Sequence, residues 1–141
     1  MARYLFALLL WLSLSACGDD AKVAAYDWIP LKVTATAYTD DPEQTSRLHP
    51  GITAWGDSLR PGVKWIAVSR DLIAKGLGHN TMVKIDTFEG IYLVKDKMHR
   101  RWRNRIDIFM GKDVERAREW GRRKVSIAYA VKKDSLNTDL K

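Results

Sequence analysis

Short apolar or alternating runs, separated by turn signals, constrain the fold of this chain more than any other sequence feature. The run at 31–38 alternates small apolar residues with threonines and a tyrosine, which is the period-two pattern of a half-buried strand. Five further runs have the composition of strands: 64–69, 82–88, 91–96, 105–110 and 124–131. Glu89-Gly90 is the expected turn of a hairpin between the two runs that flank it.

Two segments carry helix signals. Ser69 is a candidate N-cap for a short helix that runs to about Lys75. The segment 111–121 repeats apolar residues at helical spacing, with Asp113 near its start and Gly121 at its end. Six strands and two short helices in roughly a hundred residues predict a mainly β domain, closed into a small barrel or sandwich because closure removes exposed strand edges.

Residues 1–16 are predicted to be an export signal and not part of the domain. Arg3 gives a positive start, and residues 4–14 form an apolar run interrupted only by Ser13. That run is shorter than the roughly 20 residues that a permanent membrane-spanning helix needs. A segment of this kind is removed on export, so it takes no part in the fold.

Cys17 is the only cysteine, and a lone cysteine in an exported chain needs an explanation. Leu14-Ser15-Ala16-Cys17 resembles the lipobox of bacterial lipoproteins, in which the cysteine becomes the lipidated first residue. The resemblance implies a lipid anchor in the cell envelope, facing the periplasm, with the outer membrane as the expected site. An ordinary signal peptide followed by a stray thiol is the alternative. The expected organisation is then a tether over 17–30, a domain over 31–131 and a polar tail over 132–141.

The formal net charge is +7, and removal of residues 1–16 takes away Arg3 alone, which leaves +6. In the cytoplasm such a balance suggests nucleic acid as the partner. An exported chain instead meets cell-wall peptides and lactyl groups, which carry carboxylates, and lipid headgroups, which carry phosphates. We therefore expect no nucleic-acid partner and expect the charge to face the envelope, unless it only keeps the domain soluble.

Asp107 is the most informative single residue, because aspartate is disfavoured in strands and this one lies in the middle of a predicted strand. Alternation places Ile106 and Ile108 on one face and Asp107 on the other. The isoleucines are expected to face the core, so the carboxylate is expected to face solvent or a surface groove. A salt bridge to a neighbouring arginine is the alternative reason for its presence.

Several short motifs occur in the order and spacing of a known family. They are Thr53-Ala54-Trp55-Gly56 with Arg60-Pro61-Gly62, Ala67-Val68, Asp96, the run 105–109, and the run 117–125. Together they resemble the 3D, or three-aspartate, domain, which occurs at the C-terminal end of membrane-bound lytic transglycosylase A and in many small exported proteins. The resemblance covers residues 32–131 and implies a six-stranded double-psi β-barrel.

The resemblance also implies a reaction and its residues. The family's catalytic acid/base falls on Asp107 and a cleft-shaping aspartate on Asp96, so these two are the expected catalytic residues, with Thr53 and Gly56 lining the substrate cleft. The implied reaction is non-hydrolytic cleavage of the bond between N-acetylmuramic acid and N-acetylglucosamine in peptidoglycan. One aspartate protonates the leaving oxygen and then takes a proton from the sugar's own 6-hydroxyl, so one can suffice where most glycosidases need two. No cofactor is implied.

Two positions depart from the family pattern. Ser69 stands where the family has its first aspartate, and Asp71 follows two residues later. The glycine-rich loop after the second aspartate is replaced by residues 97–104, and five cations lie within 97–105. Unless these side chains point away from Asp107, cations this close predict a lowered pKa for it, which would make it a poor proton donor.

The same cationic loop is a candidate binding device. Arginine pairs bidentately with carboxylates, so Arg105 is expected to contact substrate. The indole rings of Trp102 and Trp55 are candidate stacking faces for a sugar, whereas Trp65 and Trp120 are expected to lie in the core. A solvated hairpin tip is the alternative interpretation of this loop.

Other chemistries find little support in the sequence. His49, His79 and His99 are scattered without metal-ligand spacing, so no metal site is expected. No nucleophile-elbow, phosphate-binding or dinucleotide-binding motif is present. Two functions remain: a lytic transglycosylase that acts on the glycan strands of peptidoglycan, and a non-catalytic peptidoglycan-binding or envelope scaffold module. The sequence identifies no protein partner.

Overall fold

The computed structural model describes residues 25–41 and 51–133. The predicted export signal, Cys17, most of the expected tether, His49 and the end of the tail lie outside this part of the chain. Within it, the chain forms β1 (Tyr26–Tyr38), β2 (Trp65–Val68), α2 (Arg70–Ala74), β3 (Met82–Ile85), β4 (Phe88–Lys97), β5 (Arg105–Phe109), α3 (Val114–Trp120) and β6 (Arg123–Lys132). In this described part, neither helix is long and apolar enough to cross a bilayer.

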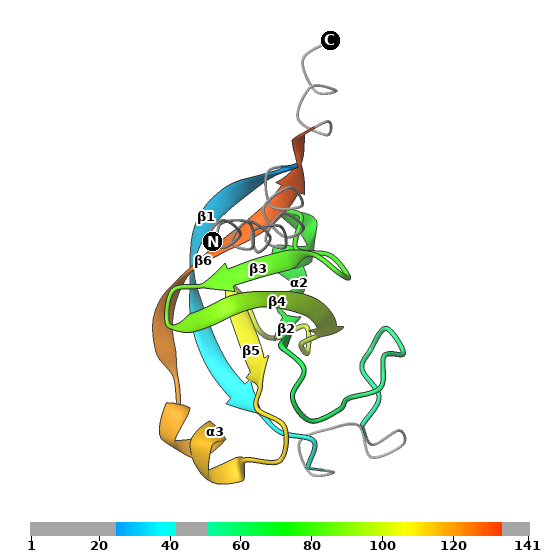
Figure 1. Cartoon of the computed structure of the whole chain (residues 1–141), viewed down its shortest axis with the longest axis vertical. Coiled ribbons are helices and arrows are strands. Elements are labelled where there is room, and N and C mark those ends of the chain that lie inside the picture. Colours follow the sequence, from blue (N-terminus) through cyan, green and yellow to red (C-terminus); the bar gives the residue numbers. More distant parts are fainter. Residues whose placement is uncertain (1–24, 42–50, 134–141) are drawn as a thin grey trace, which may run out of the picture.

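The strands of the described residues close into one barrel in the order β1-β5-β2-β4-β3-β6. The prediction of a mainly β, closed six-stranded barrel with two helices is therefore confirmed for this part of the chain. Two neighbouring pairs are parallel, β1 with β5 and β2 with β4, and the others are antiparallel. Figure 1 shows the long strands β1 and β6 side by side, with α3 at the end of the barrel toward which β1 and β5 run.

Alternate residues of the strands fill the barrel interior. Fully or almost fully buried side chains include Ile66 and Val68 of β2 and Ile106 and Ile108 of β5, and α2 adds Leu72. The isoleucines of β5 thus face the core, as predicted. The residues between them therefore face outward.

A second, smaller apolar cluster covers part of the outer face of the barrel. It consists of Tyr38, Trp65, Ala67, Met98 and Phe109, with Leu59, Val63, Leu93 and Trp102 packed against it. Trp65 lies in this cluster and Trp120 packs against the main core, as predicted for both. The outer face of β1, β5, β2 and β4 is therefore partly shielded from water, and the two candidate aspartates lie on this face.

The first strand begins earlier than the sequence pattern predicts. Residues 26–30, expected in a tether, belong to β1 and pair with the end of β6, where Tyr26 is opposite Lys132. Trp28 and Ile29 are half-buried in this pairing. Asp27 and Pro30 flank these two apolar residues and interrupt the period-two pattern, so the sequence places the start of the strand too late. The barrel extends beyond the expected boundaries at 31 and 131.

The turn of the predicted hairpin lies at Asp86-Thr87 and not at Glu89-Gly90, which belongs to β4. Asp86 anchors the turn to β6: its backbone N–H donates to the Ser126 carbonyl at 3.0 Å, and its carboxylate accepts from the Ser126 N–H at 2.9 Å. A contact between residues distant in the sequence thus determines the position of the turn and overrides the local glycine signal.

Both predicted helices are present, but Ser69 does not cap the first one. Ser69 holds the N-cap position of α2, yet its hydroxyl makes no capping hydrogen bond. Asp113 caps α3 by accepting from the Arg116 N–H at 3.0 Å, and Gly121 ends that helix with a φ of 62°. Glycine adopts this conformation without steric strain, so the predicted end of α3 is confirmed.

Replacing Ile127 with alanine is expected to destabilise the barrel by about 2–5 kcal/mol, because this side chain is 3% exposed in the main core and its loss leaves a cavity. Ile52→Ala is the matched control, since Ile52 is 39% exposed, and its effect should stay within about 0.5 kcal/mol. Chemical denaturation measures the free energy of unfolding of both variants. Equal effects would contradict the inward position of Ile127.

Candidate functional site

Four residues on neighbouring strands form one row across the outer face of the barrel. Thr36 of β1 is opposite Asp107 of β5. Ala67 of β2 is opposite Asp107 on one side and opposite Asp96 of β4 on the other. Residues opposite each other in a sheet point to the same side, and two strand spacings separate the backbones of the aspartates by about 10 Å. We call these four residues the acid row; it brings together the two predicted catalytic residues.

A β-bulge brings Asp96 into the acid row. Ile66 is opposite Val94, but the next residue, Ala67, is opposite Asp96 and not Lys95. One extra residue on a strand re-aims the side chains that follow it. Without the bulge, the regular register would place Lys95 beside Ala67. The bulge therefore decides whether this end of the row carries a carboxylate or an ammonium group.

The carboxyl group of Asp107 is partly exposed and accepts a hydrogen bond from one side chain. The hydroxyl of Thr36 donates to Oδ1 of Asp107 at 2.9 Å. Burial raises the pKa of Asp107 to about 6; the Thr36 hydrogen bond and the Arg105 charge oppose this shift, and the Asp96 charge reinforces it. A carboxyl group with this pKa populates both protonation states near neutral pH, as a general acid/base requires.

The lowered pKa expected for Asp107 from the cationic loop is therefore wrong. Arg105 acts in the expected direction, but desolvation is the larger cause. The other loop arginines, Arg100, Arg101 and Arg103, are exposed to solvent. Among the residues that the structure describes, Asp107 forms no ion pair, so the alternative of a strand-face salt bridge is not found either.

Backbone groups hold Asp96 in place. Its Oδ1 accepts from the N–H of Ala54 at 2.7 Å and from the N–H of Lys97 at 2.8 Å. Burial raises the pKa of Asp96, although both hydrogen bonds favour the charged form. The bond from Ala54 joins residues 42 positions apart and holds the 53–56 loop beside the acid row.

The 53–56 motif forms a tight loop that Asp57 fastens to the barrel. Thr53 is buried; its hydroxyl accepts from the Asp57 N–H at 3.0 Å and its carbonyl from the Gly56 N–H at 2.9 Å. Gly56 has a φ of 88°, which favours glycine. The Asp57 carboxylate pairs with Lys95 at 2.9 Å and His79 at 2.6 Å, and the Lys95 hydrogen bond is the main cause of its lowered pKa. Thr53 and Gly56 thus shape the loop beside the row.

The two tryptophans predicted to stack on a sugar both carry cations on their rings. The Nζ of Lys97 lies 5.1 Å from the centroid of the Trp55 ring. The Cζ atoms of Arg105 and Arg101 lie 3.8 Å and 4.7 Å from the centroid of the Trp102 ring. A sugar that stacked on either indole would therefore have to share it with a cation.

Tyr38 is a candidate site residue that the sequence pattern does not reveal. It is opposite Phe109 and follows Thr36 of the acid row by two residues on β1, so its side chain lies on the same outer face. Tyr38 is 8% exposed, and its hydroxyl has no hydrogen-bond partner within the described residues. Burial and the charges of Asp96 and Asp107 raise its pKa, so the phenol stays protonated. The Tyr38 hydroxyl is therefore an unsatisfied buried donor near two carboxylates.

Ser69 and Asp71, which follow β2, both hold the start of β5. The Ser69 hydroxyl accepts from the Arg105 N–H at 3.0 Å, and Oδ2 of Asp71 accepts from the Asn104 N–H at 2.9 Å. Burial opposes ionisation of Asp71, but hydrogen bonds from Ser69 and Asn104 outweigh it and lower the pKa. These contacts fix β5 two residues before Asp107, so both side chains support the site without lying in the acid row.

One cavity among the described residues lies apart from the candidate site. That cavity has a volume of about 430 Å³ and is lined by residues that include Tyr26, Met82 and Leu93, and by neither aspartate of the acid row. Within the described ranges, no group of three or more His, Cys, Asp or Glu side chains is placed to hold a metal ion. The chemistry available at the row is that of its carboxyl and hydroxyl groups.

Removing the Thr36 hydroxyl and removing the Asp96 charge are expected to shift the pKa of Asp107 in opposite directions. Thr36→Val deletes a donor to the charged form and should raise the pKa above about 6, whereas Asp96→Asn deletes a like charge and should lower it. NMR of the side-chain carboxyl carbon during a pH titration measures both shifts. Asp27→Asn, on β1 but remote from the row, is the control and should leave the pKa unchanged. Shifts of the same sign in the two test variants would contradict the described geometry.

Comparisons with known proteins do not assign the chain to a family. No family model and no curated protein sequence matches it. Among solved structures it is similar to an expansin of Clavibacter michiganensis: to the apo protein at 17% identity with a TM-score of 0.47, and to a mutant in complex with cellohexaose at 13% identity with a TM-score of 0.46. Each alignment covers 74% of this chain, which spans about half of the expansin chains, 52% and 51%. The resemblance of the sequence motifs to the 3D domain therefore stays a hypothesis.

Proposed function

We propose that the barrel binds glycan strands of the bacterial cell wall across the acid row. The row offers two carboxyl groups that accept hydrogen bonds, and the buried phenol of Tyr38 beside them would add a donor if its side chain turns toward the ligand. This mixture suits a sugar, because every sugar hydroxyl is both a donor and an acceptor. The apolar cluster around Trp65 and Phe109 shields part of the same face, and hydrogen bonds are stronger where water is excluded.

The position of Asp96 and Asp107 on either side of Ala67 is the observation that carries this proposal. Both aspartates have raised pKa values, because burial makes their charged forms less favourable than in water. Neither acid forms an ion pair in the part of the chain that is described, and no backbone N–H holds Asp107 there as two hold Asp96. Unpaired acids with perturbed pKa values are typical of functional sites.

The pKa of about 6 at Asp107 favours a second candidate function, cleavage of the bound strand. Protonated Asp107 would give its proton to the oxygen that joins C1 of N-acetylmuramic acid to N-acetylglucosamine, and that bond would break. The resulting carboxylate would then take the proton of the 6-hydroxyl of the muramic acid, whose oxygen bonds to C1 and closes a 1,6-anhydro ring. The acid returns to its starting state and no water is consumed. This is the lytic transglycosylation that the motif resemblance implies.

The proposed place of action is the cell envelope. The lipobox-like motif at 14–17 would anchor the chain through Cys17, facing the periplasm and most simply in the outer membrane, within reach of the peptidoglycan layer. Residues between the anchor and β1 would serve as a short tether. The support for this part of the proposal is the sequence alone, because residues 1–24 lie outside the described part.

Incubation of the chain with purified sacculi is expected to show co-sedimentation if the barrel binds glycan, and anhydro-muropeptides by mass spectrometry if it also cleaves. Asp107→Asn should abolish these products, because an amide cannot exchange the proton that the mechanism needs. Asp27→Asn is the matched control and should preserve both binding and products. A wild-type chain that stays in the supernatant would contradict glycan binding, and sedimentation without products would leave binding as the function.

Tyr38→Phe is expected to weaken binding to soluble glycan strands by roughly five- to tenfold, because one hydrogen bond to the ligand is lost. The free energy of unfolding should not fall, since the hydroxyl has no partner in the described structure. Calorimetric titration measures the affinity and chemical denaturation measures the stability. Lower stability with unchanged affinity would assign the hydroxyl a structural role and remove it from the site.

A further inference from the structure

An arginine lies one row beyond the acid row on the same outer face. Arg105 precedes Asp107 by two residues on β5, which places the two backbone positions about 6.6 Å apart with side chains on the same side. Arg105 is 9% exposed, and its Nε has no hydrogen-bond partner within residues 25–41 and 51–133. Burying a charged group with a free donor is costly unless something pairs with it.

Trp102 gathers two guanidinium groups at this position. The Cζ atoms of Arg105 and Arg101 lie 3.8 Å and 4.7 Å from the centroid of its ring. An aromatic face attracts a cation, and a guanidinium stacked on a ring keeps its N–H donors free for another partner. Trp102 also packs against the apolar cluster of the outer face, so the barrel itself holds this arrangement.

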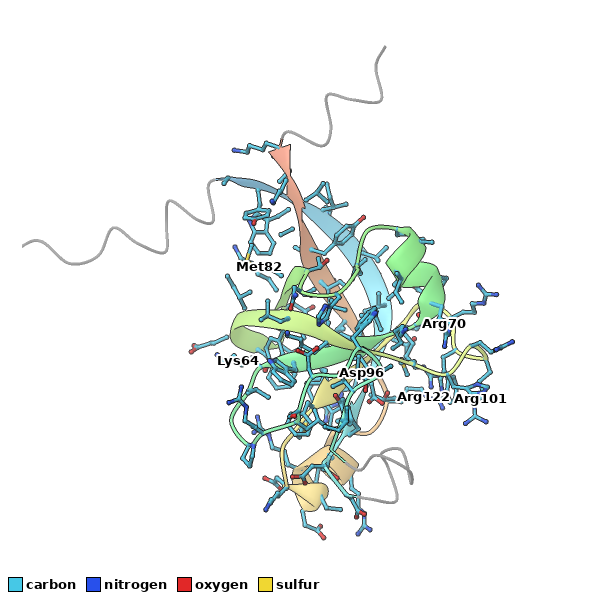
Figure 2. All side chains as sticks on the ribbon, turned by 90° about the vertical axis from the view of Figure 1, so that its right-hand side faces the viewer. Lys64, Arg70, Met82, Asp96, Arg101 and Arg122 are labelled. Atoms are coloured by element: carbon cyan, nitrogen blue, oxygen red, sulfur yellow. The ribbon has the colours of Figure 1, made fainter. Side chains whose placement is uncertain are left out.

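Arg122, which immediately precedes β6, adds a third positive charge. It is exposed, and its charge depresses the pKa of Arg105 further, after burial as the larger cause. In the view of Figure 2, Arg101 and Arg122 project to the same side of the barrel, beyond Asp96. We call Arg101, Arg105 and Arg122, together with Trp102, the arginine cluster.

The arginine cluster has no ion-pair partner in the described part of the chain. Asp57 and Glu115 form ion pairs there, neither with an arginine of the cluster. Asp107 attracts Arg105 from the neighbouring row without forming an ion pair with it. Like charges held together repel one another, so an anion supplied from outside would stabilise the cluster.

We propose that the arginine cluster is a subsite for a carboxylate carried by the glycan that binds the acid row, so that the chain selects acidic over neutral glycans. This inference rests on the proposed function and deepens it. A guanidinium group matches a planar carboxylate with two parallel hydrogen bonds, which makes the carboxylate the fitting ligand. In peptidoglycan, this group is the lactyl or peptide carboxyl of N-acetylmuramic acid.

The opposite charges of the acid row and the arginine cluster would also set the position of the bound glycan strand on the barrel surface. The acid row repels an anionic substituent, whereas the arginine cluster attracts it about 6.6 Å away. An acidic glycan therefore binds with its neutral ring over Asp107 and its carboxylate over Arg105. The opposite register would place a carboxylate against Asp96 and Asp107 and is disfavoured.

The test compares three ligands that differ in charge: peptide-free glycan strands, which carry lactyl carboxylates; the same strands with those carboxylates converted to methyl amides; and neutral N-acetylchitohexaose. Calorimetric titration of the full chain measures each affinity. The test variant is Arg101→Gln with Arg122→Gln, both at exposed positions. The matched control, Arg60→Gln with Arg118→Gln, removes the same charge at exposed positions outside the cluster.

Wild type and control are expected to bind the acidic strands at least about tenfold more tightly than the amidated strands, and the test variant should lose this preference. Its affinity for the two neutral ligands should stay within about twofold of wild type, because the acid row is intact. Equal wild-type affinity for acidic and amidated strands would overturn the subsite and leave glycan binding standing. Failure to bind any of the three would instead contradict the proposed function.

Two further results would overturn the subsite. An equal loss in the control variant would mean that net charge, and not the cluster, attracts the acidic strands. Vesicles that contain phosphatidylglycerol test a lipid phosphate as the ligand. If the test variant loses vesicle binding but keeps its preference for acidic strands, the cluster binds the membrane surface and not the glycan.

Discussion

The pairing of β5 with β1 on one side and β2 on the other is the constraint on which the whole site depends. It places Asp107 between Thr36 and Ala67, so that one strand register creates the hydrogen bond to the carboxyl group. Ser69 accepts from the N–H of Arg105, the first residue of β5, and Asp71 accepts from the N–H of Asn104 just before it. The position of the acid is thus determined by main-chain contacts to three other segments and not by a flexible loop.

Burial outweighs the positive charge of the chain at this site. The rise in the pKa of Asp107 from 3.8 to about 6 corresponds to roughly 3 kcal/mol between its two protonation states. Exposed arginines at the loop surface are screened by water and salt, so they oppose this shift only weakly. The partial shielding of the outer face by the second apolar cluster is the physical reason that the desolvation effect is the larger one.

Alternate residues of β5 give the outer face three chemistries at intervals of about 6.6 Å: the cation of Arg105, the acid of Asp107 and the ring of Phe109. Neighbouring strands extend two of these rows: Asp96 lies two strands from Asp107, across Ala67, and Tyr38 lies opposite Phe109.

The sequence by itself determined the number of strands and helices in the described part, the inward isoleucines of β5 and the end of α3 at Gly121. These follow from periodicity and local turn chemistry, which act over a few neighbouring residues. The choice of Asp96 and Asp107 as candidates came instead from the resemblance of the motifs to the 3D domain. Only the tertiary structure decided the early start of β1, the turn at Asp86, the bulge that admits Asp96, the direction of the Asp107 pKa shift and the unpaired Tyr38. Each of these depends on which distant segments pair and on how much water their pairing removes, and no local pattern carries that information.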